Sequence, residues 1–188
     1  MNLTERAKNM ILQPAQEWSA IDQEPGSAAD LFQSYVAPLA AIGPVASIIG
    51  LSIFGIGGSY RVPLTNTIGH AVTTYVFALI GTYVLALIID ALAPTFLGTK
   101  NNFQALKVAA YSNTAAWLAG IFNLLPSLAA LQILGLYSLY LLYLGLPVLM
   151  KAPKEKAMPY TIVVVIAAIV IFGVIGALGS CFLTRPLP

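Results

Sequence analysis

The stretch Val108–Met150, VAAYSNTAAWLAGIFNLLPSLAALQILGLYSLYLLYLGLPVLM, contains no charged residue over 43 positions. A helix rises 1.5 Å per residue, so about 20 apolar residues cross a hydrocarbon core of about 30 Å. The stretch is therefore too long for one crossing. Because proline cannot continue a helix and serine can cap the next one, we expect a tight hairpin at Asn-Leu-Leu-Pro-Ser, residues 123–127.

Uncharged runs of similar length lie on both sides of this stretch. They are long and lack the period-two alternation of transmembrane strands, which favours helices. The sequence therefore predicts an all-α fold, a polytopic membrane helical bundle. Its five transmembrane helices are expected at about residues 35–57, 68–93, 108–125, 128–150 and 160–183.

The composition excludes most other classes of protein. Hydrophobic residues make up 59% of the 188 and charged residues 9%, and the mean hydropathy is +0.84. Soluble domains are about 45–50% apolar and about 25% charged. The sixteen charges are too few and too scattered for a soluble domain, a disordered chain, a coiled coil or a nucleic-acid module. The single cysteine, Cys181, excludes an intrachain disulfide.

The positive charges predict an orientation, because lysine and arginine concentrate in cytoplasmic segments. With the N-terminus inside, the outer segments hold only Arg61 and Arg185. We therefore expect the N-terminus in the cytoplasm and the C-terminus outside. The inner segments then hold Arg6, Lys8, Lys100, Lys107, Lys151, Lys154 and Lys156.

The first 34 residues are too polar to span a membrane and are expected to form cytoplasmic, amphipathic helices ahead of a membrane domain at residues 35–188. Pro14 begins a second short helix, with Trp18 and Ile21 on one side and Glu17 on the other. We favour helices that cover the inner ends of the bundle over a partner-binding element. In the first helix the apolar face is Leu3, Ala7, Met10 and Ile11, and Glu5, Arg6, Lys8 and Asn9 are placed away from it.

Asp90 is the single carboxylate inside a predicted span. Intramembrane carboxylates are costly and need a partner, and the end of a helix is unfavourable for an anion. We expect Asp90 to be clamped by Lys107, Tyr111 or Asn113, with an ion or proton site as the alternative. If the clamp exists, Asp90→Leu lowers stability. The lone His70 is expected to be an interfacial polar residue, since no second metal ligand is suitably spaced.

Other residues of the membrane segments suggest packing. Tyr140 and Tyr143 belong to a tyrosine stripe that forms either hydrogen-bonded packing or a polar path between helices. Lys151, Lys154 and Lys156 form an inner rim that carries the orientation signal or contacts anionic headgroups. Small residues allow close helix packing, within the chain or between copies. The glycines expected on such faces are Gly43, Gly50, Gly57, Gly173 and Gly176.

No catalytic residue, metal site or cofactor is expected. An aspartyl site needs two facing carboxylates, and a serine nucleophile needs a base with an orienting partner. The chain also lacks a Walker loop, a dinucleotide fingerprint and a His/Cys cluster.

Spans three to five resemble a known family. The segments are VAAYSNTAAW (108–117), YLLYLGLPVLMK (140–151), PKEKA (153–157) and YTIVV (160–164), with PAQEWSAI (14–21) near the start. They are similar to the Yip (Ypt/Rab-interacting protein) domain family, prokaryotic-type members in particular. The resemblance implies five membrane helices and a cytoplasmic N-terminus. Eukaryotic members bind Rab-type GTPases, but the short N-terminal segment here, without their long leader, argues against that partner.

Three hypotheses follow for the function. The first is a non-enzymatic scaffold or interaction protein in a prokaryotic plasma (inner) membrane, with lipid, further copies or other membrane proteins as partners and no nucleic acid. The second is a small channel or transporter with a polar cleft around Asp90. The third is a lipid-binding or membrane-shaping protein.

Overall fold

A computed structural model describes residues 2–55 and 62–183 of the chain, with side chains up to residue 173. The described part is helical and contains no strand. Two short helices come first, α1 (Leu3–Leu12) and α2 (Pro14–Gln23). The side chain of Asn2 caps α1, and Pro14 begins α2, where its missing amide costs nothing.

The first long apolar helix is continuous but uneven. It consists of α3 (Ala28–Leu31), η1 (Phe32–Val36), α4 (Ala37–Ala40), α5 (Ile42–Ile49) and η2 (Gly50–Phe54). Ser27 caps its start. Pro38 and Pro44 cannot donate a backbone hydrogen bond, which is a known cause of such irregular turns. The second long helix is regular and consists of α6 (Leu64–Leu92) with η3 (Ala93–Phe96) at its end.

Residues 102–149 form a hairpin of helical segments. The first arm is α7 (Asn102–Ser112), α8 (Thr114–Ala119) and η4 (Gly120–Leu124), and the second is η5 (Pro126–Leu136) and α9 (Tyr137–Leu149). The predicted break is confirmed: Leu125 is extended, with φ −123° and ψ 106°, and Pro126 starts the next segment. The last helix is α10 (Lys154–Leu183).

Four segments are long and apolar enough to cross a membrane: Ala28–Phe54, Leu64–Phe96, Pro126–Leu149 and Lys154–Gly173. They overlap four of the five predicted spans. The remaining prediction, residues 108–125, is not one uninterrupted helix, since a turn at Asn113 separates α7 from α8 and the helix tightens from Gly120 onward. The membrane-spanning character of four helices is thus supported, and a fifth crossing is not confirmed.

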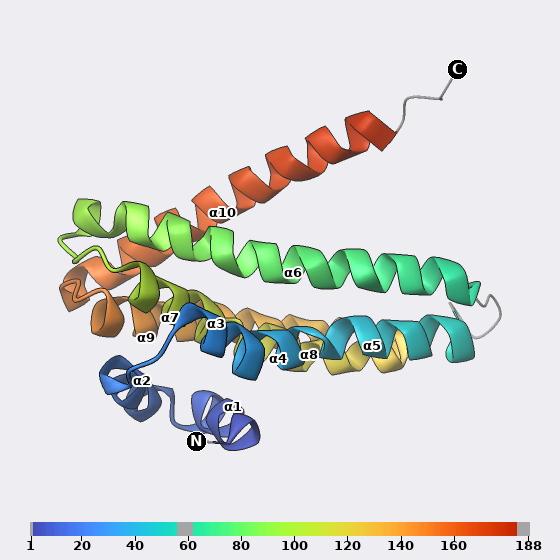
Figure 1. The fold of residues 1–188 in the computed structure, drawn as a ribbon, viewed down its shortest axis with the longest axis horizontal. Coiled ribbons are helices and arrows are strands. Elements are labelled where there is room, and N and C mark those ends of the chain that lie inside the picture. Colours follow the sequence, from blue (N-terminus) through green and yellow to red (C-terminus); the bar gives the residue numbers. More distant parts are fainter. Residues whose placement is uncertain (1, 56–61, 184–188) are drawn as a thin grey trace.

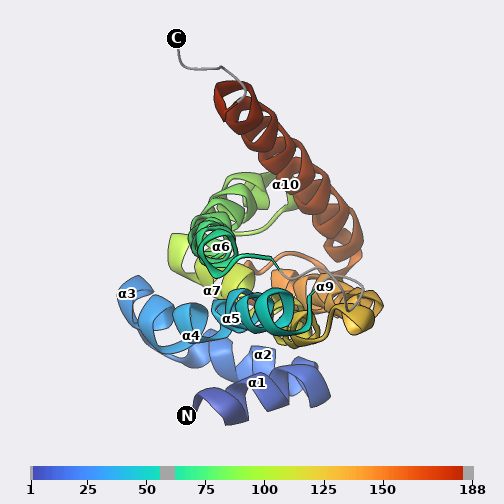
Figure 2. The ribbon, with the colours of Figure 1, turned by 90° about the vertical axis from the view of Figure 1, so that its right-hand side faces the viewer.

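The long segments lie side by side, and α1 and α2 lie against one side of the bundle near one of its ends, which is called the inner end here after the predicted orientation (Figures 1 and 2). Helix α7 is central at that end because it packs against α6 and α9. Its small residues allow this: Ala105, Val108, Ala109 and Ala110 are completely buried. Helix α10 packs on α6 and α9 at the inner end and then diverges from both (Figure 1).

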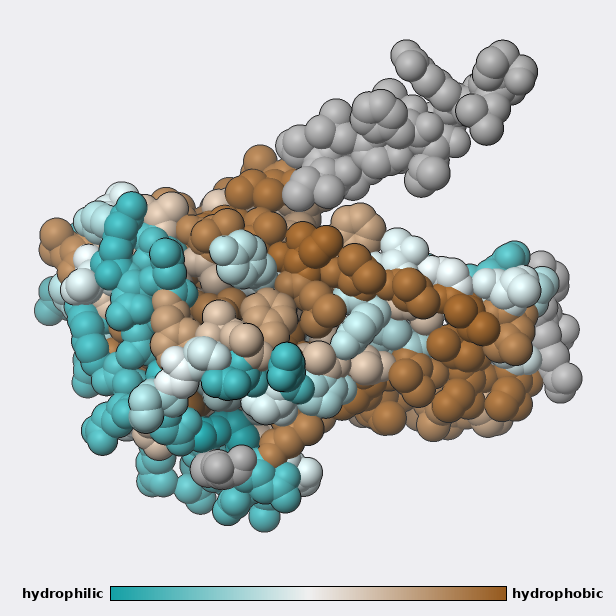
Figure 3. Space-filling model, in the orientation of Figure 1, coloured by the Kyte–Doolittle hydropathy of each residue, from teal (hydrophilic) through white to brown (hydrophobic). Residues whose placement is uncertain are grey.

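The surface agrees with this arrangement. Hydrophilic residues gather at the inner end and over α1 and α2, whereas hydrophobic residues cover the sides of the long helices (Figure 3). Exposed apolar side chains such as Phe77, Ile80, Ile133 and Ile169 belong to those sides. A lipid environment accounts for such a surface, which water does not tolerate at this extent.

Candidate functional site

The densest polar cluster of the described residues lies where α1 and α2 meet the inner end of the bundle. We call it the inner junction, and it consists of Arg6, Glu17, Glu24 and Lys107 with the aromatic residues Trp18 and Tyr111. Two cations there face two carboxylates. Arg6 and Glu17 are buried, at 5% and 7% exposure, and so is Lys107, at 4%.

Arg6 holds the two N-terminal helices together. Its Nη1 donates to Glu17 Oε1 at 2.6 Å, and its Nη2 donates to Glu24 Oε2 at 2.6 Å. Burial opposes the charge of Arg6, but the hydrogen bond to Glu24 and the neighbouring negative charges outweigh it, so the pKa of Arg6 is raised. Arg6 also lies 5.7 Å from the centre of the Tyr111 ring, a cation–π contact. The guanidinium therefore stays charged and joins α1, α2 and α7.

Lys107 reaches from α7 to the end of α2. Its Nζ donates to the carbonyl oxygens of Ile21, at 2.9 Å, and Glu24, at 2.6 Å. The last carbonyls of a helix lack partners within it, and a cation suits the negative end of the helix dipole. Burial lowers the pKa of Lys107, and the carboxylates of Glu24 and Asp22 oppose this without cancelling it. Lys107 thus caps α2 rather than serving Asp90.

Trp18 is the apolar centre of the junction. It is completely buried, its ring meets that of Tyr111 edge-on at 6.3 Å, and it lies against Gly145 of α9. A Cβ at Gly145 would lie 2.7 Å from Trp18 Cζ2, so only glycine permits this approach. Two of the segments that carry the family resemblance, residues 14–21 and 140–151, therefore meet at this contact.

Polar contacts also extend the junction on both sides. Within the bundle, Tyr35 packs on Tyr111 at 4.5 Å, and its hydroxyl is 2.7 Å from Thr114 Oγ1. At the surface, Lys151 Nζ donates to Asp22 Oδ2 at 2.5 Å. These contacts fasten α2 to the loop after α9 and the first long helix to the junction between α7 and α8.

The buried charges were not expected from the sequence, which placed Arg6 and Glu17 away from the apolar faces. That placement is wrong, because both side chains are buried. The spacing contained a signal: Arg6 lies three residues after Leu3 and four before Met10, and Glu17 lies four before Ile21. Such spacings share one helix face. The prediction from hydrophobicity placed these charged side chains in water, whereas their pairing with each other made their burial possible.

The predicted clamp on Asp90 does not form. Lys107 and Tyr111 belong to the inner junction, and the Asn113 side chain donates to the carbonyl oxygen of Ala109 at 2.9 Å. Asp90 Oδ1 is buried and accepts no hydrogen bond from the described residues. The neighbouring Tyr160 hydroxyl donates to the Ile89 carbonyl at 2.5 Å instead. The clamp fails because the end of α2 lies beside α7 and offers Lys107 two carbonyl oxygens.

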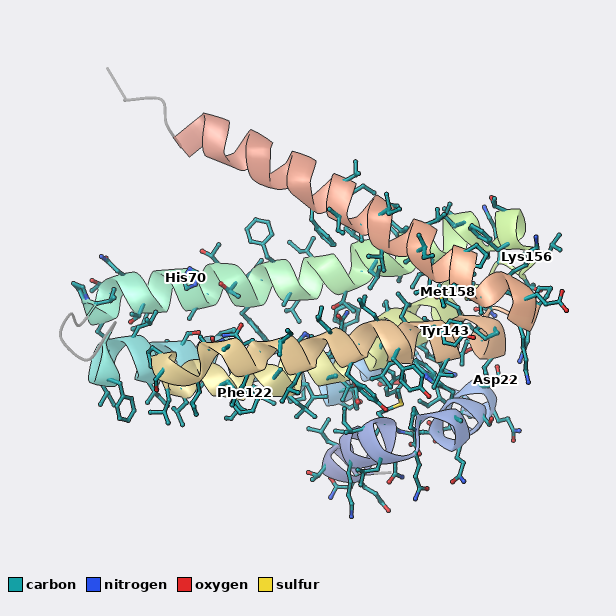
Figure 4. The ribbon with its side chains drawn as sticks, turned by 180° about the vertical axis from the view of Figure 1, so that it is seen from behind. Asp22, His70, Phe122, Tyr143, Lys156 and Met158 are labelled. Carbon is teal, nitrogen blue, oxygen red and sulfur yellow. The ribbon has the colours of Figure 1, made fainter. Side chains whose placement is uncertain are left out.

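The two predicted tyrosines are also separate from Asp90. Tyr140 and Tyr143 line a groove between α9 and α10, together with Met158 (Figure 4). Neither hydroxyl makes a hydrogen bond to the described residues, unlike Tyr137, which donates to the Ile11 carbonyl at 3.1 Å. The polar cleft that was to unite Asp90, Asn113 and these tyrosines is therefore not assembled in this structure.

The predicted glycines differ in their surroundings. A Cβ at Gly50 would lie 2.1 Å from the carbonyl oxygen of Asn123, and one at Gly120 would lie 2.8 Å from Gly43 Cα. Gly43 and Gly50 thus serve packing of the first long helix against η4 within the chain. Among the side chains that the structure describes, a Cβ at Gly173 would meet nothing within 4 Å. Gly57 lies outside the described residues, and at Gly176 the structure describes only the helical backbone.

The three lysines of the predicted inner rim differ in their contacts. Lys151 pairs with Asp22, whereas Lys154 and Lys156, in the first turn of α10, are exposed and make no ion pair with the described residues. His70 is exposed on α6, far from the inner end (Figure 4). Within the described residues, no group of three or more His, Cys, Asp and Glu is placed to hold a metal ion.

Comparison with protein families gives one result: the Yip1 domain matches residues 8–175. The chain belongs to the Yip1 domain family. Comparisons with curated proteins and with solved structures find no significant match. The Yip1 domain match includes α2 and α9, so the contact between Trp18 and Gly145 lies within the domain. A membrane protein of this family agrees with the four long apolar helices.

Proposed function

We propose that this chain is a non-enzymatic scaffold or interaction protein of the membrane. The observation that carries the proposal is the inner junction, where Arg6 pairs with Glu17 and Glu24 and Lys107 bonds to the last carbonyl oxygens of α2, so that α1 and α2 are held in place. Paired and buried groups are suited to holding a surface in place rather than to proton transfer. The held helices expose a polar face, which includes Glu5, Lys8 and Gln16.

The second part of the proposal is the topology, with five crossings, the N-terminus inside and the C-terminus outside. Residues 108–119 at 1.5 Å and residues 120–124 at 2.0 Å per residue give about 28 Å, close to the hydrocarbon thickness. This arm runs beside the long helices (Figure 1). Lysines of three segments, the loop before α7, α7 itself and the segment after α9, also gather at the inner end. The membrane that we propose is a prokaryotic plasma membrane, based on the resemblance of the chain to prokaryotic Yip proteins.

Reporter fusions test this topology. A reporter inserted in the loop near Lys100 is expected to be active in the cytoplasm, and one at the C-terminus is expected to be active outside. Four crossings instead of five would place both reporters on the same side. That result would refute the fifth crossing.

Site-specific photocrosslinking tests the proposed role. The photoreactive group replaces Gln16 on the exposed face of α2, and a control replaces Leu87 on the apolar side of α6. We expect a discrete crosslinked product from position 16, with a second copy or another membrane protein. Arg6→Met, which releases α1 from α2, is expected to abolish that product. A protein that stays monomeric, with no product from position 16, would contradict the scaffold role.

A further inference from the structure

The groove between α9 and α10 is a cavity of about 510 Å³ near the inner end, and it is separate from the inner junction. Its walls are mainly apolar. Tyr140 and Tyr143 line the α9 side and Met158, Ile162 and Ile166 the α10 side. Figure 4 shows Tyr143 and Met158 on adjacent helices. Several wall residues are exposed, including Tyr140 at 47% and Ile162 at 50%, so the groove opens on the side of the bundle.

The length of the groove matches one leaflet. Along α10 it extends from Met158 to Ile166. Eight residues at 1.5 Å give about 12 Å, and half of the hydrocarbon core is about 15 Å. An acyl chain of the inner leaflet therefore fits along it, whereas a helix of a second copy would extend through both leaflets.

Positive charge lies at the inner end of the same groove. Lys154 precedes Met158 by four residues and Thr161 by seven, spacings that put it on the groove face of α10. Lys156 lies two residues before Met158, on the opposite face. The segment from Lys151 to Lys156 holds three lysines and one glutamate, and only Lys151 forms an ion pair with the described residues.

We propose that this groove binds one anionic phospholipid of the inner leaflet. One acyl chain lies between α9 and α10, and the headgroup phosphate contacts Lys154. The charge of Lys154 selects the anionic headgroup, and the apolar walls hold the chain. The hydroxyls of Tyr140 and Tyr143 supply hydrogen-bond donors along the path of the lipid.

Native mass spectrometry of the full chain tests this proposal. The purified protein is titrated with phosphatidylglycerol and, separately, with phosphatidylcholine of the same acyl chains. Lys154→Gln is compared with Lys156→Gln, a matched loss of one charge on the other face. Ile162→Trp, which fills the groove, is compared with Val163→Trp, an exposed neighbour that does not line it. Circular dichroism and thermal melting confirm that each variant is folded.

We expect one bound phosphatidylglycerol with a preference over phosphatidylcholine. Lys154→Gln is expected to weaken it about fivefold, the effect of one lysine at an anionic membrane surface, and Lys156→Gln to leave it unchanged. Ile162→Trp is expected to remove the bound lipid and Val163→Trp to retain it. Equal effects within either pair, or equal binding of the two lipids, would overturn the proposal. None of these results bears on the scaffold role, which concerns α1 and α2.

Discussion

Gly145→Ala is the sharpest test of how the N-terminal helices are held. A Cβ at this position would lie 2.7 Å from Trp18 Cζ2 and 2.9 Å from Cε2 and Cη2. Carbon atoms pack best at about 3.5–4.0 Å, so the indole must move by about 1 Å. Trp18 is completely buried and has no space to move into without displacing α2.

The expected cost follows from two opposing effects. Overpacking of a well-packed core costs about 1–3 kcal/mol. Alanine is about 1 kcal/mol better than glycine inside a helix. The net loss for Gly145→Ala is therefore at most about 2 kcal/mol. It cannot exceed the cost of undocking Trp18, which is about 5 kcal/mol for some 200 Å² of buried area.

Tryptophan fluorescence measures this loss directly. The chain has two tryptophans, so the assay uses a Trp117→Phe background in which Trp18 alone reports. Denaturant titration in nanodiscs follows the shift of its emission as α2 is released. We expect Gly145→Ala to lower the midpoint and to shift the native emission to the red.

A double-mutant cycle separates the steric effect from helix propensity. In a Trp18→Leu background the overlap is absent, so Gly145→Ala is expected to be neutral or stabilising when unfolding is followed by circular dichroism. If Gly145→Ala leaves both the midpoint and the emission of Trp18 unchanged, the contact between α2 and α9 is not as close as the structure describes, and the reasoning fails.

Three further predictions concern buried charge and close packing. Arg6→Met leaves Glu17 buried without its cation, so the release of α1 and α2 is expected to become easier by about 3 kcal/mol in the same fluorescence titration. Asp90→Leu removes a buried oxygen that has no hydrogen-bond partner among the described residues, so it is expected to keep or raise the melting temperature; a clear decrease would restore the clamp hypothesis. Gly50→Ala, whose Cβ would lie 2.1 Å from a backbone oxygen, is expected to destabilise the bundle strongly, whereas Gly173→Ala, with none of the described residues within 4 Å of its Cβ, is expected to be neutral or stabilising. Thermal melting in nanodiscs compares the two glycine variants, and equal melting temperatures would contradict the packing described for η4.

Predictions from the sequence succeed where they depend on neighbouring residues and fail where they depend on contacts between segments that are distant in the sequence. Helix existence depends on local hydrophobicity, so four of the five spans and the break at Pro126 were found. The arm at residues 108–125 was harder, because its interruption at Asn113 depends on a side chain that bonds back to Ala109. The site was predicted least well from the sequence. Several groups could have bonded to Lys107, and which of them does so depends on where α2 lies.

The sequence by itself determined the class of this protein: an all-α chain with long apolar helices, polar N-terminal helices and a resemblance to the Yip family. These properties follow from composition and local spacing, which are present in every conformation of the chain. Only the tertiary structure decided which charges are buried. Arg6, Glu17 and Lys107 leave water because docking α1 and α2 on α7 and α9 brings opposite charges and free carbonyls to them. Asp90 meets no such partner among the described residues. Pairing over long distances in sequence makes a buried charge tolerable. Local spacing places Arg6 and Glu17 on the faces of Met10 and Ile21, but it does not contain the identity of the groups that they meet.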